Sequence, residues 1–303
     1  MGDILLSIVS IYLFIVIGFF LKRQFRDEVN SKTLTILSVY ALQPMLTFWG
    51  LTLRPIDSSL AIAPTLFFLT ATISVIFTYS LSKFFYRDDN KKGAILTSIA
   101  LIGNTGNLGI PLGIAIFGED SVPYTSIINI ANILFIYTIG VYTLAKSEYS
   151  VKEAVKSIGS IPIIYVAIFA LFWNLQGFEL ADGLKEALHM GAYASIVVQL
   201  IIFGAYLSEV RVKEFEIKLH LLVNSVKFLL LPLIGFTAIY IFSYSGLGAS
   251  VLLMELMMPL AVNSVNMATL YNTLPKNVTA LILSSSLLFI ALFLLFGAEF
   301  LKL

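Results

Sequence analysis

The sequence predicts an all-α membrane protein with ten transmembrane helices, and its composition is the first reason. Hydrophobic residues make up 58% of the 303 residues and charged residues only 12%, with a mean hydropathy of +0.93. A soluble domain carries about 25% charged residues, so ordinary soluble enzymes and disordered proteins are excluded. The net charge of +1 lacks the basic excess of a nucleic-acid-binding protein. The chain has no cysteine, which rules out a disulfide, a thiol nucleophile and a cysteine-ligated metal.

Ten apolar segments recur along the chain, each close to the ~20 residues that a helix needs to cross a bilayer. They are continuous apolar runs, without the period-two alternation of membrane β-strands. The first is expected to stay in the mature protein, because Lys22 and Arg23 follow its apolar run instead of preceding it. The segments are 3–21, 34–52, 60–82, 93–117, 123–145, 159–176, 187–207, 217–243, 249–271 and 277–300.

Lysine and arginine alternate between the loops of this ten-helix arrangement. The loops after the first, third, fifth and seventh segments carry three or four of them, whereas those after the second, fourth, sixth and eighth carry one or none. Positive residues collect on the cytoplasmic side of membrane proteins. We therefore expect a multi-pass protein of the plasma (cell) membrane with both termini extracytoplasmic.

The number of segments on either side of the central hydrophilic stretch predicts an inverted repeat. Five helices precede the stretch and five follow it, and because five is odd the second set enters the membrane in the opposite direction. Pro111 and Pro259 are separated by about half the chain, as are Gln43 and Gln199. The predicted domains are a first five-helix repeat at 1–146, a cytoplasmic linker at 147–157 and a second, inverted five-helix repeat at 158–303.

Two of the segments, the fourth and the ninth, carry residues that interrupt a helix. The fourth holds four glycines and Pro111 within 103–113, at a cost of about 1 kcal/mol per glycine and about 3 kcal/mol for proline. The ninth holds Pro259, Asn263 and Ser264 near its centre. In lipid, freed backbone is tolerated only where protein or a water-filled cavity covers it. Paired interruptions in two halves point to a transporter binding site, and half-helix N-termini there favour an anion.

Two motifs in these segments resemble the auxin efflux carrier family. They are GNTGNLGIPLG at 103–113, followed by Phe117 and Gly118, and MELMMPLAVNSVNMATLYN at 254–272. The family includes plant auxin exporters and bacterial permeases of malate, malonate and related organic acids. The resemblance implies the fold type of bile-acid symporters and sodium/proton antiporters, in which the fourth and ninth helices break at their prolines and cross. It also implies a scaffold of segments 1, 2, 6 and 7, an elevator-like movement and a homodimer.

The resemblance also implies which residues bind the substrate. Packing between helices would explain the glycines of the fourth segment, but not its polar residues. For the two glutamines, hydrogen bonding between helices is the alternative, and the same is expected for Asn129, Asn132 and Asn224. The candidates are Asn104, Thr105, Asn107 and Pro111 on the first crossing segment, Pro259, Asn263 and Ser264 on the second, and Gln43 and Gln199 on the scaffold. The short central stretch differs from the long loop of many plant members, which weakens the case for auxin as substrate.

Two charged residues fall inside predicted spans. Lys227 lies about ten residues into the eighth segment, roughly 15 Å deep, where a cation costs at least ~2.5–3.5 kcal/mol. It could balance an anionic substrate, titrate, or stand where related folds bind sodium; the structural alternatives are snorkelling and pairing with a carboxylate. Glu255 could carry a proton or pair with Lys227. Both are candidates for charge compensation and coupling.

The predicted function is secondary transport of small organic anions by alternating access, with a proton as a candidate coupling ion. The alternatives are a sodium-coupled organic-anion symporter of the same fold and a transporter-like ligand sensor. An enzyme is not expected, because no His-Glu-x-x-His motif occurs and His189 and His220 fall near segment ends. No cofactor or metal site is expected, since the acidic pair Asp88 and Asp89 lies in a basic loop.

Overall fold

The protein is helical throughout its described regular structure. The computed structural model describes residues 2–145, 156, 159–208 and 215–300, and within them one isolated β-bridge is the only strand-like pairing. Six described helical runs are long and apolar enough to cross a membrane: Ser31–Thr52, Ser58–Phe85, Glu119–Leu144, Asp182–Ser208, Ile217–Ile241 and Pro275–Phe293. Most of the linker expected at 147–157 lies outside the described residues.

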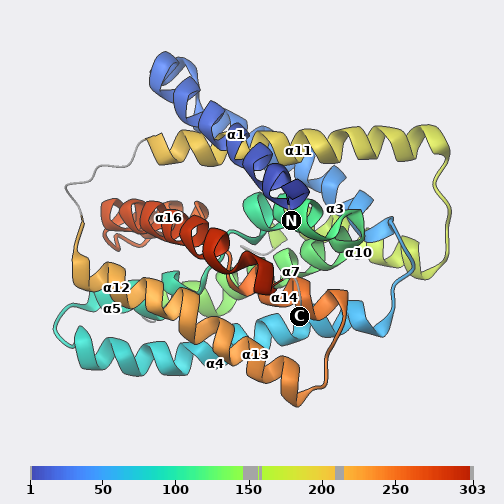
Figure 1. The fold of residues 1–303 in the computed structure, drawn as a ribbon. Helices are drawn as coiled ribbons and strands as arrows, with labels where there is room; N and C mark the ends of the chain where they lie inside the picture. Colours follow the sequence, from blue (N-terminus) through green and yellow to red (C-terminus); the bar gives the residue numbers. More distant parts are fainter. Residues whose placement is uncertain (1, 146–155, 157–158, 209–214, 301–303) are drawn as a thin grey trace.

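One group of helices is built around α1 and α11, which lie side by side at the top of Figure 1. Two glycines allow this approach: a Cβ on Gly18 would overlap the Ile201 backbone, and one on Gly204 would overlap the Ile15 backbone. Helix α3 packs against α11 and α10. This group consists of α1 (Gly2–Phe25), α2 (Ser31–Leu37), α3 (Gln43–Thr52), α10 (Pro162–Leu175) and α11 (Asp182–Ser208).

The second group is built around α4, which packs against α5, α7, α13 and α14. The Asp57 side chain caps α4 by accepting from Leu60 N at 2.9 Å. Over its 28 residues α4 is about 42 Å long, enough to cross a bilayer. The group consists of α4 (Ser58–Phe85), α5 (Asn90–Thr97), α6 (Ile110–Phe117), α7 (Val122–Phe135), α8 (Val141–Ala145), α12 (Ile217–Ser225), α13 (Leu231–Ile241), α14 (Leu247–Leu256), α15 (Asn263–Leu270) and α16 (Pro275–Phe300).

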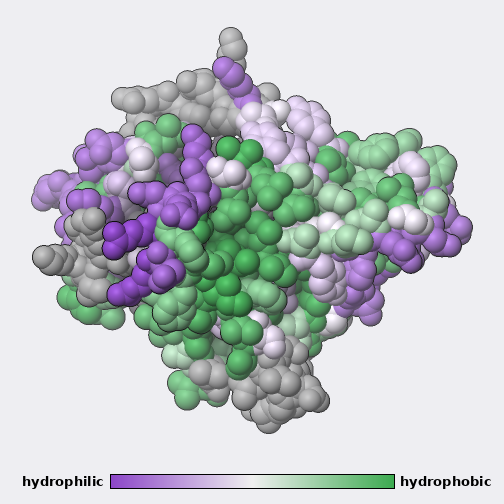
Figure 2. All heavy atoms as spheres, turned by 90° about the horizontal axis from the view of Figure 1, so that it is seen from above, coloured by the Kyte–Doolittle hydropathy of each residue, from purple (hydrophilic) through white to green (hydrophobic). Residues whose placement is uncertain are grey.

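The surface is divided into a hydrophobic middle and hydrophilic ends. On the face shown in Figure 2, hydrophobic residues cover the centre and hydrophilic residues collect at both ends. Large apolar side chains such as Ile76, Phe84 and Leu233 are more than half exposed. A soluble protein rarely exposes apolar patches of this extent, so the belt matches the hydrocarbon layer of a membrane.

Both segments expected to be interrupted are interrupted. Helix α5 ends at Thr97, and after a short 3-10 turn the chain is extended at Ile102 before a π-turn, Thr105–Gly109, leads into α6. Helix α14 ends at Leu256 and α15 begins at Asn263. The expected break at proline is right for Pro259, which lies between α14 and α15, and wrong for Pro111. Pro111 opens α6, where its missing N–H costs no intrahelical hydrogen bond.

Candidate functional site

The two interrupted segments meet backbone to backbone. Gly103 and Leu260 form the isolated antiparallel bridge. Asn104 N donates to Pro259 O at 2.8 Å, and Ala261 N donates to Ile102 O at 3.1 Å. Each unwound stretch therefore satisfies backbone groups of the other, which is the condition for irregular backbone at membrane depth.

Side chains from neighbouring helices brace this crossing. From α7, Asn132 Nδ2 donates to Gly103 O at 2.8 Å and to Thr105 Oγ1 at 2.9 Å. Thr105 Oγ1 in turn donates to Asn129 Oδ1 at 2.9 Å. On the other side, Leu260 N donates to Ser285 Oγ of α16 at 3.1 Å. The hydrogen bonding between helices predicted for Asn129 and Asn132 is confirmed, and in this setting it holds the first break in shape. Asn224, the third of that set, bonds its Nδ2 to His220 O within α12 and to Ser284 Oγ of α16.

A cavity of about 120 Å³ lies at the crossing. Five candidate residues line it: Gln43, Asn104, Thr105, Asn107 and Asn263. Asn129, Asn132 and Asn266 also contribute to the wall, so amides and hydroxyls dominate the polar lining, and among the described residues no charged side chain belongs to it. The Asn104 side chain is 3% exposed, and its Nδ2 has no hydrogen-bond partner among the described residues. The site therefore holds a buried donor without an acceptor.

The helix starts converge on the same cavity. The helical run Thr105–Phe117 begins with a residue of the cavity wall, and so does α15, which begins at Asn263. The N-terminus of a helix carries about half a positive charge from its unpaired N–H groups. Two such ends at one cavity favour an anionic group there.

Four candidate residues lie away from the cavity wall. Pro111 is buried in α6, Pro259 is buried in the break between α14 and α15, and Ser264 is fully buried on α15. Gln199 is buried on α11, where its Nε2 donates to Ser195 Oγ at 2.7 Å. These residues shape the crossing and its surroundings, and none of the four lines the cavity.

Lys227 and Glu255 are both buried behind the first break. Lys227 is 1% exposed and Glu255 0%, which excludes snorkelling to the surface. Lys227 Nζ lies 3.0 Å from the position that a Cβ on Gly103 would take, and the Glu255 carboxylate occupies the place of a Cβ on Gly109. The described residues include no ion pair within 4 Å between the two side chains. They stand at opposite ends of residues 103–109, which comprise the end of the break and the π-turn after it.

Contacts near Glu119 join the two helix groups. Glu119, just after α6, accepts a hydrogen bond from Tyr193 of α11, with 2.6 Å between Tyr193 OH and its Oε1. His189 Nε2 lies 3.5 Å from the same oxygen, and the His189 ring packs on Trp49 at 5.0 Å. The cavity wall instead includes Thr35 and Tyr206, close to the start of α2 and the end of α11. The cavity is thus displaced toward the opposite end.

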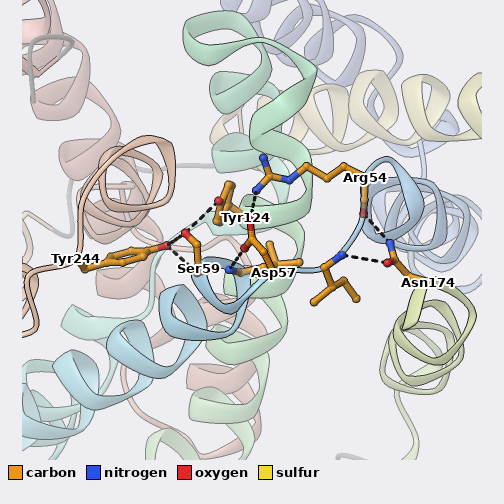
Figure 3. A network of polar contacts seen from close by, with 8 residues as sticks. Arg54, Asp57, Ser59, Tyr124, Asn174 and Tyr244 are labelled. Carbon is orange, nitrogen blue, oxygen red and sulfur yellow. Dashed lines mark hydrogen bonds and ion pairs between the residues drawn. The ribbon is translucent and has the colours of Figure 1, made fainter. Parts of the chain in front are cut away.

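The α3–α4 connection is held by contacts with α10 and α7 (Figure 3). Asn174 of α10 donates to Leu51 O and Arg54 O, both at 2.7 Å, and accepts from Ile56 N at 3.1 Å. The Arg54 guanidinium lies 4.6 Å from the centre of the Tyr124 ring of α7, a cation–π contact. The connection is therefore tied both to the α1–α11 group and to the α4 group.

Comparison with known proteins identifies the family of this chain. The chain matches the family described as membrane transport protein over residues 3–161 and 150–296, nearly its whole length. This chain belongs to that membrane transport family, which is the auxin efflux carrier family. An uncharacterised transporter of Methanocaldococcus jannaschii is 24% identical over 273 residues, covering 87% of this chain and 88% of that protein. An uncharacterised transporter of Methanothermobacter thermautotrophicus is 23% identical over 259 residues, covering 84% of each.

Membership of this transport family confirms the resemblance found in the sequence. It makes the chain a multi-pass membrane protein of a transporter family, not of an enzyme family.

Three contacts in and around the site were not predicted from the sequence: the hydrogen bond to Ser285, the Glu119–Tyr193 hydrogen bond and the hydrogen bonds of Asn174. The serine-rich tenth segment was the only sequence signal for the first of these. The other two join residues 74 and 123 positions apart, and nothing local marks either pair.

Proposed function

We propose that the protein is a secondary transporter of small organic anions that works by alternating access. The substrate carboxylate binds in the cavity at the crossing of the two interrupted helices. One observation carries this proposal: two helical runs begin at a cavity that also holds the unpartnered donor Asn104 Nδ2. Helix N-termini and amide donors offer hydrogen bonds to an anion without a fixed counter-charge in the wall.

Lys227 and Glu255 supply charge compensation and coupling in this proposal. Lys227 sits directly behind Gly103, so its positive charge acts on the cavity through one residue of backbone. Glu255 approaches Gly109 at the other end of the stretch and is a candidate carrier of a coupled proton. A sodium-coupled symporter of the same fold remains the second candidate. It is less favoured because the described cavity wall, although it offers amide and hydroxyl oxygens, has no carboxylate to balance the charge of Na⁺.

The proposed movement separates the two helix groups. The α1–α11 group acts as the scaffold of a homodimer, and the α4 group with both interrupted helices shifts against it within a 5+5 inverted repeat. The cavity lies toward the end that carries Lys32, Lys83 and Lys218, which we assign to the cytoplasm, with both termini on the other side. The Glu119–Tyr193 contact then closes the extracytoplasmic side.

The experiment that tests this function is solid-supported-membrane electrophysiology on the purified protein in liposomes. A panel of mono- and dicarboxylates is applied at two pH values without sodium. We expect a substrate-dependent current that Asn104→Ala abolishes. The matched control is Asn224→Ala, because Asn224 bonds to His220 O within α12 and lies outside the cavity wall, so its current should persist.

Other outcomes separate the alternatives. A current that requires sodium would establish the symporter. Acid binding by calorimetry without a current, in the presence or absence of sodium, would support a ligand sensor. Equal currents from the Asn104→Ala variant and the wild type would contradict the assignment of the cavity as the substrate site.

A second prediction concerns the Glu119–Tyr193 contact, which we propose closes the extracytoplasmic side. Tyr193→Phe removes a hydrogen bond to a carboxylate, an interaction worth about 1.5–3 kcal/mol, and should shift the population toward the state open on that side. Ser126 is buried at the α3–α7 contact, against Gly50. Because the chain has no cysteine, Ser126→Cys gives a single maleimide target. We expect its labelling to become about tenfold faster in the Tyr193→Phe background.

The control is Tyr165→Phe, which removes the hydrogen bond that Tyr165, on α10, donates to Gly159 O, away from the Glu119–Tyr193 contact. Labelling should be unchanged in that background. Equal rates in all three proteins would show that the Glu119–Tyr193 contact does not hold the two groups together.

A further inference from the structure

A second hollow lies outside the crossing, between the end of α4, the start of α5 and α8. It measures about 420 Å³ and is lined by Tyr79, Lys83, Tyr86, Asn90, Thr97 and Tyr142, among others. No carboxylate belongs to its described lining. Tyr79 and Tyr142 are more than half exposed, which places phenol groups along its rim. Tyrosines at such a rim are typical of the level of the lipid headgroups.

Lys83 is the single cation in the described wall of this hollow. Its Nζ lies 5.4 Å from the centre of the Tyr79 ring, and in the described part of the chain no carboxylate is within 4 Å of it. Lys92, nearby on α5, is already compensated: its Nζ is 2.8 Å from Glu216, and this hydrogen bond raises the pKa of Lys92. Lys83 is therefore a positive charge available to an external anion.

An apolar row on α4 leads directly to Lys83. Ile62, Leu69 and Ile76 are 39%, 36% and 67% exposed and follow one another at intervals of seven residues. Seven residues are nearly two helical turns, so the three side chains lie in one row, with about 10 Å between neighbours. Lys83 is the next position in the same row. Helix α4 lies near the lower edge of the bundle in Figure 1, and the exposure of its three apolar side chains leaves the row free to contact lipid.

We propose that this hollow binds the headgroup of an anionic phospholipid. The phosphate pairs with Lys83, the tyrosine hydroxyls at the rim bond to its glycerol and headgroup oxygens, and an acyl chain follows the row from Ile76 toward Leu69. A free phosphate ion would bind only weakly here, because the single ammonium group of Lys83 is its main partner. The apolar row supplies the rest of the binding energy, and only a lipid can use it. The site is independent of the substrate cavity.

Native mass spectrometry of the full-length protein in neutral detergent tests this site. Phosphatidylglycerol and phosphatidylcholine with identical acyl chains are added at equal concentrations. We expect more phosphatidylglycerol to be retained, and Lys83→Ala to lower its retention about fivefold. Lys83→Arg should keep it. Lys32→Ala is the matched control, because Lys32 is an exposed lysine at the same end and outside the hollow.

Three results would overturn the proposal. Equal retention of the two lipids would show that charge is not recognised. An equal loss in Lys32→Ala would show a diffuse surface effect instead of a site. Displacement of the lipid by millimolar inorganic phosphate would assign the hollow to a free anion. Size-exclusion profiles establish that each variant is folded before the comparison is made.

Discussion

Gly109→Ala is expected to destabilise the protein and stop transport. The place of an added Cβ is occupied by the Glu255 carboxylate, and both groups are fixed in the packed centre of the molecule. Overpacking of a core costs about 1–3 kcal/mol and at times more. The measurement is the apparent Tm in detergent, which should fall by several degrees at about 2–4 °C per kcal/mol, together with the transport current.

A control and a second background make this prediction specific. Gly183→Ala, on α11, places a Cβ in open space and should leave Tm and current near the wild-type values. Glu255→Ala removes the carboxylate but leaves Lys227 without its opposite charge, so the comparison is made within that background: Gly109→Ala should lower Tm much less in Glu255→Ala than in the wild type. An equal loss of Tm in both backgrounds would show that the Gly109–Glu255 approach is not the cause.

Lys227→Met is expected to have the second large effect. It leaves the Glu255 charge buried without its opposite charge, and breaking a buried charge pair typically costs about 3–5 kcal/mol. The separation beyond 4 Å between the two groups puts this variant toward the lower end of that range. The yield of monodisperse protein and its Tm should both fall.

The neutral double variant Lys227→Met/Glu255→Gln separates folding from transport. With both charges removed, Tm should recover toward the wild-type value, while the organic-anion current and its pH dependence should stay absent. Glu255→Gln alone should keep a substrate response but lose its pH dependence. A double variant with a normal, pH-dependent current would contradict a coupling role for either residue.

The interruption of the fourth and ninth segments was predictable because its cause is local. Glycine and proline lower helix stability wherever they stand, and polar residues such as Asn104 and Asn263 are costly in lipid unless something covers them. The exact position of each break depends on contacts with the rest of the protein. Pro111 is compatible with the first turn of a helix, so the chain is not broken there. The first break lies at Ile102 instead, where the backbone of the other interrupted segment supplies hydrogen-bond partners.

The candidate residues also differ in how far the sequence could predict their positions. Asn104, Thr105 and Asn107 reached the cavity wall as their place in the motif indicated. Gln199, equally polar, turned to Ser195 of its own helix. The spacing of residues along a helix predicts which side chains share a face of that helix. It does not predict which other helix packs against that face.

The sequence by itself determined the membrane environment, the apolar segments, the two interruptions and the family, because each depends on composition or on residues close together along the chain. Only the tertiary structure decided which groups share the cavity, that Lys227 and Glu255 flank the first break, and that Glu119 meets Tyr193. These contacts join residues from distant segments. Their partners are chosen by close packing of whole helices, and no local pattern in the chain encodes that choice.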